Sequence, residues 1–109
     1  MSPDSGFLED IRREARLALE FIAGISEADF ERDQKTQHAV VRCLEIIGEA
    51  ANNISAKTRE ELTSIPWTEI VAQRHIAIHH YRKLDMPRIW ATVKDDLPKL
   101  IETLERYVP

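Results

Sequence analysis

The sequence predicts a small all-α protein. Only three glycines and 6% aromatic residues are present, which disfavours a β-sandwich built from tight turns and β-forming residues. Helix-forming Ala, Leu, Ile, Glu, Arg and Lys dominate instead, and apolar residues recur at spacings of three and four. With 43% hydrophobic and 31% charged residues the chain has a globular composition, and its 109 residues suit one domain, 1–109.

The first helix is expected to begin after Asp4 or Ser5, with residues 1–5 as a flexible tail, and to run to about Ala23. Its buried face is formed by Phe7, Leu8, Ile11, Ala15, Ala18, Leu19 and Ile22. Gly24 is a stop signal, and the segment from Ser26 to Asp29 resembles a capping box. Residues 26–33 then form either a separate turn or the start of the next helix.

A second long helix is predicted over roughly 34–54, with an apolar stripe of Val40, Val41, Leu44, Ile47, Gly48, Ala51 and Ile54. Gly48 lets another helix approach closely, either within the chain or across a dimer contact. Cys43, which lies on the apolar pattern, is interpreted as a buried small hydrophobe rather than a reactive thiol.

Residues 55–66 are predicted to connect to a third helix over about 67–81, with one helical turn on the way and Pro66 closing the connection. Asp85 is the expected N-cap of a last helix over 86–107. Pro98 must kink or split that helix, because proline removes a backbone donor and crowds the preceding turn.

Composition also narrows the function classes. A net charge of −4 disfavours general adhesion to nucleic acid or to an anionic membrane. No apolar stretch approaches the roughly 20 residues needed to cross a bilayer, and the acidic N-terminus does not resemble a secretory signal. The single cysteine fits a reducing compartment, so we expect a cytoplasmic protein. A domain this small gains from sharing helix faces, which favours a dimer.

A basic segment stands out in this acidic chain. Residues 70–84 contain no acidic residue but hold His75, His79 and His80 together with Arg74, Arg82 and Lys83. Any nucleic-acid site is therefore expected here. These six residues are the candidate catalytic and substrate-binding side chains.

Arg74 lies in the middle of an apolar stripe that includes Trp67, Ile70, Val71, Ile78 and Tyr81. A guanidinium in such a row stays charged, so it needs a carboxylate, a phosphate or a partner chain. One interpretation is an ion pair with Glu45 or Glu49 of the preceding helix. The other is binding of a substrate phosphate.

The histidines have three interpretations. His75 and His79 are four residues apart and could bind zinc, but a third ligand and the glutamate of an HExxH motif are missing. They could also be ordinary surface residues. The third interpretation is acid–base chemistry near neutral pH, with Arg74 stabilising the charge on a phosphorane. That combination, with neither metal nor cofactor, favours cleavage of RNA through its 2′-hydroxyl.

Arg74 and His79 are five residues apart, so on one helix they point about 140° away from each other. An arginine that wraps around the helix, a distorted helix or two chains sharing each site would each bring them together. We favour two chains.

The same residues resemble a known family. Arg74, His79 and Tyr81 match the R-x4-H-x-Y motif of HepT-like proteins, in the HEPN superfamily and long grouped as domain of unknown function 86. The likeness covers nearly the whole chain, with further similar segments at 44–51 (LEIIGEAA), 65–67 (IPW) and 90–98 from Trp90 to Pro98.

The resemblance implies a HEPN-type antiparallel bundle of four to five helices that forms a homodimer, with the motif helices meeting at a cleft. It implies a metal-independent endoribonuclease toxin in which Arg74 and His79 are catalytic. It also implies a partner, a nucleotidyltransferase antitoxin of the MntA type, that transfers AMP to Tyr81. The alternatives are a non-catalytic HEPN module that binds a nucleotide or partner, and a helical adaptor with incidental histidines. Tyr81 could equally be an aromatic residue that closes the core.

Overall fold

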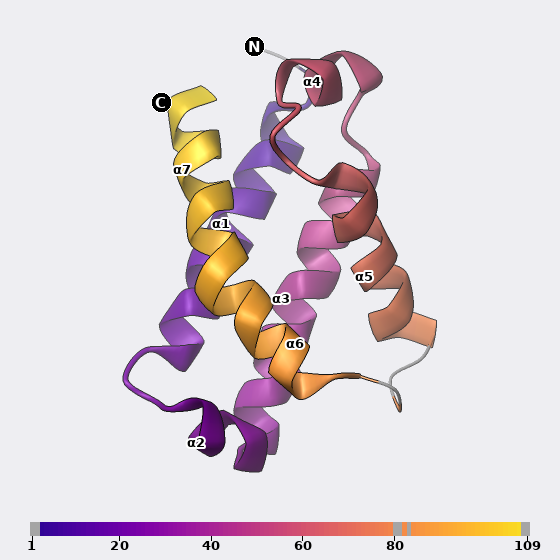
Figure 1. The fold of residues 1–109 in the computed structure, drawn as a ribbon. Helices are drawn as coiled ribbons and strands as arrows, with labels where there is room; N and C mark the ends of the chain where they lie inside the picture. Colours follow the sequence, from indigo (N-terminus) through magenta and orange to yellow (C-terminus); the bar gives the residue numbers. More distant parts are fainter. Residues whose placement is uncertain (1–2, 80–81, 83, 108–109) are drawn as a thin grey trace.

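The protein is an all-α bundle, as predicted (Figure 1). The structure, a computed structural model, describes residues 3–79, 82 and 84–107, with only the backbone for Ile78 and His79. In that part of the chain there is no β-strand. The long helical segments are α1 (Ser5–Ile22), α3 (Gln34–Asn52), α5 (Trp67–His79) and a last segment made of α6 (Met86–Ala91), η2 (Thr92–Asp96) and α7 (Leu97–Tyr107). Two short helices, α2 (Glu27–Arg32) and α4 (Ala56–Glu61), lie in the connections.

The core lies between α1, α3 and the last segment, while α5 packs on the outer side of α3 (Figure 1). The apolar stripes predicted for α1 and α3 supply most of it: Leu8, Ile11, Ala15, Ala18, Ile22, Val40, Cys43, Ile47 and Ala51 are all buried. Leu97, Leu100 and Leu104 of α7 close the third side. No described helix is long and apolar enough to cross a membrane.

The helix ends follow the local signals in the sequence. Gly24 adopts a positive φ of 80° after α1, and Ser26 and Asp29 form the predicted capping box of α2. Residues 27–32 are therefore a separate short helix, held against α6 by Phe30, whose ring lies 5.4 Å from that of Trp90. Asp85 caps α6 by accepting a hydrogen bond from the amide of Arg88. The side chains of Ser26 and Asp85 thus satisfy backbone N–H donors that the start of a helix leaves free.

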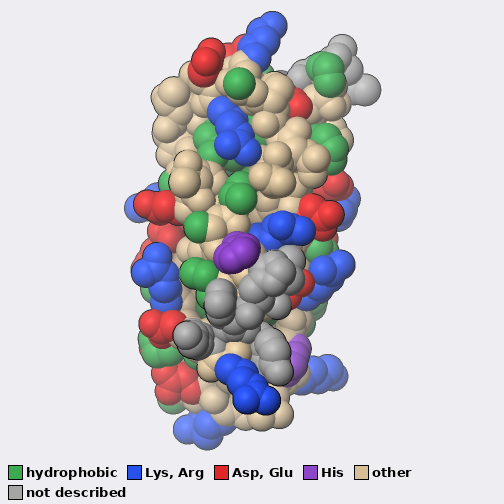
Figure 2. Space-filling view, turned by 90° about the vertical axis from the view of Figure 1, so that its right-hand side faces the viewer, with side chains coloured by type: hydrophobic (Ala, Val, Ile, Leu, Met, Phe, Trp, Pro, Cys, Tyr) green, Lys and Arg blue, Asp and Glu red, His purple; other side chains and the backbone are tan. Residues whose placement is uncertain are grey.

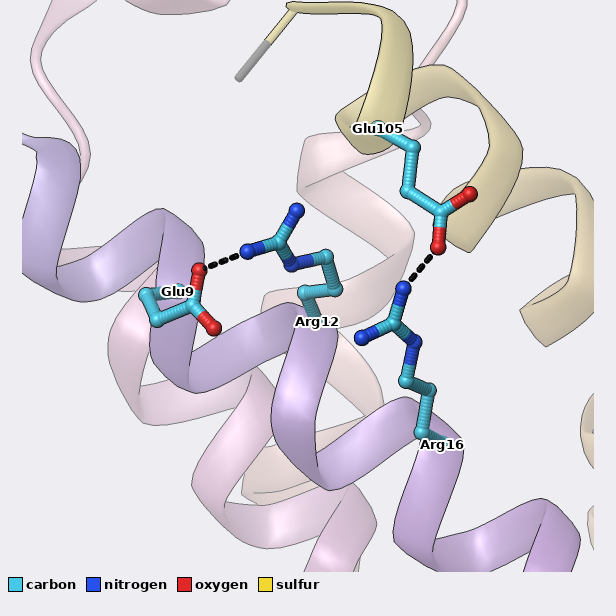
Figure 3. Close-up of polar contacts among 4 residues, drawn as sticks. All are labelled: Glu9, Arg12, Arg16 and Glu105. Atoms are coloured by element: carbon cyan, nitrogen blue, oxygen red, sulfur yellow. Dashed lines mark hydrogen bonds and ion pairs between the residues drawn. The ribbon is translucent and has the colours of Figure 1, made fainter. Parts of the chain in front are cut away.

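An ion pair links the first and last helices on the surface. Arg16 of α1 and Glu105 of α7 point toward each other across the gap between the two helices (Figure 3). One turn earlier on α1, Arg12 pairs with Glu9 of the same helix (Figure 3). Exposed pairs of this kind contribute about 0–1 kcal/mol each, so the buried leucines hold α7 in place more than these contacts do.

Pro98 distorts the last helix without splitting it. The chain remains helical from Met86 to Tyr107, but residues Thr92–Asp96 form a π-turn in which the amide of Leu97 donates to the carbonyl of Thr92. This wider turn relieves the crowding that a proline imposes on the carbonyl four residues before it. The predicted disturbance is therefore confirmed as a π-turn just before Pro98.

Trp67 anchors the start of α5. Its buried indole donates a hydrogen bond to the carbonyl of Leu62 at 3.1 Å. Arg59 lies over the same ring at 5.8 Å and donates to the carbonyl of Ala51 at 2.7 Å, near the end of α3. The connection between α3 and α5 is thus fixed by one aromatic side chain and one cation.

Cys43 is buried and is not in a disulfide, which confirms its interpretation as a small core residue. Burial, together with the neighbouring carboxylate of Glu14, raises the pKa of its thiol to about 12. A thiol with so high a pKa is protonated at neutral pH and is a poor nucleophile.

Asp4 and Ser5 belong to the folded unit, although the sequence places them in a flexible tail. α1 begins at Ser5, and the carboxylate of Asp4, only 5% exposed, accepts hydrogen bonds from the hydroxyls of Ser55 and Thr58, both at 2.5 Å. The amide of Ser55 donates to it as well. Sequence reasoning missed this contact because its partners are more than fifty residues away in the chain.

We expect Asp4→Ala to lower the free energy of unfolding by about 1–3 kcal/mol, because two hydroxyls and an amide lose a charged acceptor. The hydrogen bonds from Ser55 and Thr58 lower the pKa of Asp4 in the folded state. Its contribution is therefore complete well above the ordinary pKa of 3.8 and is lost as the pH falls below that value.

Urea unfolding at pH 7 and pH 3 measures this effect, with Asp10→Ala, a surface carboxylate on the same helix, as the control. We expect the control to change the stability by less than about 0.5 kcal/mol. An Asp4→Ala loss of the same size at both pH values would contradict the assignment.

Candidate functional site

The candidate site lies on α5, the helix that carries the basic segment. α3 is the principal neighbour of α5. Trp67 is buried and Ile70, Val71 and Arg74 are half-buried, so the described part of the predicted stripe faces the body of the protein. This places the backbone and the first side-chain carbons of Arg74 against α3.

Arg74 rests on the backbone of α3 at Gly48. A Cβ atom built on Gly48 would overlap the Cβ of Arg74 and would lie 3.2 Å from its Cγ. The buried Nε atom of Arg74 has no hydrogen-bond partner among the described residues. The aliphatic stem is therefore packed against the protein, and the guanidinium retains donors for a ligand.

The alternative that Arg74 forms an ion pair with Glu45 or Glu49 is not supported. Among the described residues, no carboxylate lies within 4.0 Å of its guanidinium. Glu45 pairs with Arg42 instead, at 3.2 Å, and Glu49 is exposed. Arg74 is thus a partly buried cation without a described counter-charge, which is an unfavourable arrangement for a purely structural residue.

The other predicted residues are placed only in part. His75, next to Arg74 on α5, is exposed, and Arg82 is exposed beyond the helix. His79 is the last residue of α5, so its backbone lies five residues and about 140° from Arg74, while its side chain is outside the described part. His80, Tyr81 and Lys83 lie outside the described residues.

The middle of the face formed by α5 holds few acidic side chains (Figure 2). Figure 2 shows hydrophobic side chains, Lys or Arg and a histidine in the middle of this face, with most acidic side chains toward its edges. Positive charge on an otherwise acidic protein concentrates an anion at that location. This surface is suited to phosphate.

Two cavities flank α5 on the side of the last helical segment. The larger, of about 360 Å³, has a mainly apolar floor that includes Ile47, Ile70 and Leu100, and polar groups that include Glu69 and Asp96. The smaller, of about 130 Å³, lies toward the end of α5 between Ile76, Leu84 and Arg88. Gln73 lines both cavities, so they are neighbours. Neither Gln73 nor Arg88 is marked by a sequence motif, and only the packing of α5 reveals them.

We expect Arg74→Met to leave the free energy of unfolding unchanged within about 0.5 kcal/mol, or to raise it by up to about 1 kcal/mol. Methionine keeps the stem over Gly48 and removes a charge without a described counter-charge. Arg59→Met is the matched control, because Arg59 donates to Ala51 and lies over Trp67, and its loss is expected to cost about 1–2 kcal/mol. Urea unfolding measures both. A loss above 1 kcal/mol for Arg74→Met would show that Arg74 has a stabilising partner.

Known proteins resemble this chain over most of its length. The model of the family described as "Ribonuclease HepT-like" matches residues 11–107. A protein of Thermococcus cleftensis named "Probable ribonuclease HepT" is 43% identical over 100 residues, which cover 92% of this chain and 91% of the relative. "Putative RNase MJ1380" of Methanocaldococcus jannaschii is 39% identical over 99 residues, covering 91% of each chain. "Putative RNase TTE0752" of Caldanaerobacter subterraneus is 39% identical over 94 residues, covering 86% of this chain and 84% of the relative.

No solved structure gives a significant match. The family match extends from the first helix to the last and includes the whole basic segment, so it covers both the fold and the candidate site. The resemblance that the sequence shows at Arg74, His79 and Tyr81 is thereby confirmed at the level of the family. The chain belongs to the HepT-like ribonuclease family.

Proposed function

We propose that this protein is an endoribonuclease that cleaves RNA without a metal ion, and that residues 1–109 act as one catalytic domain. The observation that carries the proposal is the guanidinium of Arg74, which lies on the helix of the basic segment and has no described carboxylate partner. An RNA phosphate supplies the missing negative charge. The names of the relatives, which describe ribonucleases, support the same activity.

In the proposed reaction His79 accepts the proton of the 2′-hydroxyl, and the 2′-oxygen attacks the adjacent phosphorus. The bond from phosphorus to the 5′-oxygen breaks, and that oxygen takes up a proton from an imidazolium. The products are a 2′,3′-cyclic phosphate and a 5′-hydroxyl. Arg74 stabilises the additional negative charge on the phosphorane, and His75, His80, Arg82 and Lys83 hold the neighbouring phosphates.

The protein is further proposed to act as a homodimer in which the α5 helices of two chains meet. α5 carries apolar residues on more than one face, but α3 is its principal neighbour in the chain. Ile76 is 44% exposed on this helix. A second copy of α5 would cover it, and would also bring His79 of one chain toward Arg74 of the other, which one straight helix cannot do.

The proposed regulation of the ribonuclease activity involves Tyr81 of the same R-x4-H-x-Y motif. We propose that the protein is a cytoplasmic toxin, and that a nucleotidyltransferase antitoxin silences it by transferring AMP to Tyr81. Tyr81 follows Arg74 by seven residues, two turns of a helix, so a continued helix would put both on nearly one line. The phosphodiester added to Tyr81 would be attracted to Arg74 and would compete with the RNA phosphate.

A cleavage assay on labelled RNA in the presence of EDTA tests the activity. We expect wild-type protein to cleave, and His79→Ala and Arg74→Met to lose about 10²-fold or more of the rate, because each removes a group that acts in the transition state. His38→Ala, an exposed histidine on α3, is the control and is expected to cleave at the wild-type rate. An oligonucleotide without 2′-hydroxyls is expected to stay intact.

Each other result has a definite meaning. Cleavage by His79→Ala at the wild-type rate would overturn the assignment of His79, and cleavage only after metal is added would overturn metal independence. A folded wild-type protein that does not cleave and carries an added AMP mass, absent in Tyr81→Phe, would be the silenced form. A folded, unmodified and inactive protein would support the non-catalytic binding module instead.

A substitution that introduces a charge into the proposed contact between the two α5 helices tests the dimer. We expect Ile76→Glu to shift the sedimentation mass from twice the 12.6 kDa chain to a single chain, because a carboxylate cannot be buried without a partner. Phe21→Glu is the matched control, since Phe21 is similarly exposed, at 39%, but lies on α1. A monomeric wild-type protein that cleaves RNA would rule out the shared site.

A further inference from the structure

We infer that Gly48 is a positioning residue for Arg74: its missing side chain lets α5 approach α3 so closely that the Arg74 stem lies directly on the α3 backbone. Gly48 is buried in the middle of α3. An added Cβ would overlap the Cβ of Arg74, and it would lie 3.1 Å from the carbonyl oxygen of Ile70 and 3.2 Å from Arg74 Cγ. All three contacts are with one turn of α5.

The glycine is required for space and not for its backbone conformation. The only glycine with a positive φ among the described residues is Gly24, so Gly48 has helical angles that alanine would also adopt. Glycine is disfavoured inside a helix relative to alanine. Gly6, on α1, has no atom within 4 Å of its Cβ position, which shows that this crowding is specific to position 48.

The atoms that crowd Gly48 cannot give way by a simple rotation. One is the first carbon of a side chain and another is a backbone oxygen, so an added methyl group must displace the helix itself. α5 has α3 as its principal neighbour, and no other described element packs against it to a similar extent. The displacement would therefore carry Arg74 with it and move its guanidinium relative to the rest of the site.

The catalytic consequence rests on the proposed function, because it matters only if Arg74 binds the scissile phosphate. The contact itself does not rest on it. A transition state in which charge develops on phosphorus demands a fixed donor position, and a displacement of about 1 Å is enough to lower the rate strongly. We therefore expect kcat to respond to Gly48→Ala more than KM does.

The decisive measurement is the ¹⁵N–¹H signal of the Arg74 side-chain Nε, whose atom is buried in the wild type. Loss of one signal in Arg74→Lys assigns it. We expect Gly48→Ala to shift this signal and to speed its exchange with water, while the Arg59 Nε signal stays in place. Gly6→Ala is the matched control and is expected to change neither signal. An unmoved Arg74 signal in folded Gly48→Ala would overturn the inference.

Cleavage under steady-state conditions, which yields kcat and KM, is the second readout. We expect Gly48→Ala to lower kcat at least 10-fold with less than a threefold change in KM, at unchanged helicity, and Gly6→Ala to retain wild-type values. If Arg74→Met cleaves as well as wild type, the proposed role of Arg74 fails while the spectroscopic result still decides the inference. If Arg74→Met loses activity and Gly48→Ala does not, only the inference fails.

A folding defect in Gly48→Ala would also be informative. Because the overlap is with the Cβ of Arg74, the second substitution Arg74→Gly removes the obstructing atom. We expect Arg74→Gly to raise the urea midpoint of Gly48→Ala, because it removes the overlap. In Gly6→Ala there is no overlap to remove, so Arg74→Gly only adds a helix-breaking residue and is expected to lower the midpoint. Failure of Arg74→Gly to raise the midpoint of Gly48→Ala would overturn the inference.

Discussion

The close contact between α3 and α5 at Gly48 is the constraint on which the candidate site depends. α5 is a helix at the edge of the bundle, and α3 is its principal neighbour. Trp67 fixes its first turn, and the Arg74 stem fixes its middle against a glycine. The packing of α5 on α3 therefore determines which side chains of α5 are exposed, including that of His75.

Several arginines have partners within the fold, whereas Arg74 has no described carboxylate partner. Arg12, Arg16 and Arg42 have carboxylate partners, and Arg59 donates to the end of α3. Arg74 is more constrained by packing than a typical surface arginine, yet no described carboxylate pairs with it. Fixing the stem reduces the entropy that a ligand phosphate must overcome when it binds, and the absence of a competing carboxylate keeps the cation available.

The last helical segment shapes the other side of α5. Its π-turn includes Thr92 and Asp96, and both line the larger cavity beside Ile70. Pro98 is the cause of that turn, so a residue outside the basic segment affects the surface next to it. The mixture of apolar floor and polar rim along α5 is typical of a surface that another molecule covers, which agrees with a second copy of the chain as the proposed neighbour.

The sequence alone determined the helical class, the helix limits and the basic segment. Capping residues, Gly24 and the apolar stripes act through neighbours three or four residues away, so the chain order already contains the information. The family was also recognisable, because its motif lies within eight consecutive residues from Arg74 to Tyr81. Tertiary structure decided what depends on distant pairs: that Asp4 is bound by Ser55 and Thr58, that no described carboxylate pairs with Arg74, and that Gly48 faces Arg74. Helical periodicity assigns a residue to a face of its own helix, but only the packing of two helices decides which atoms on those faces meet.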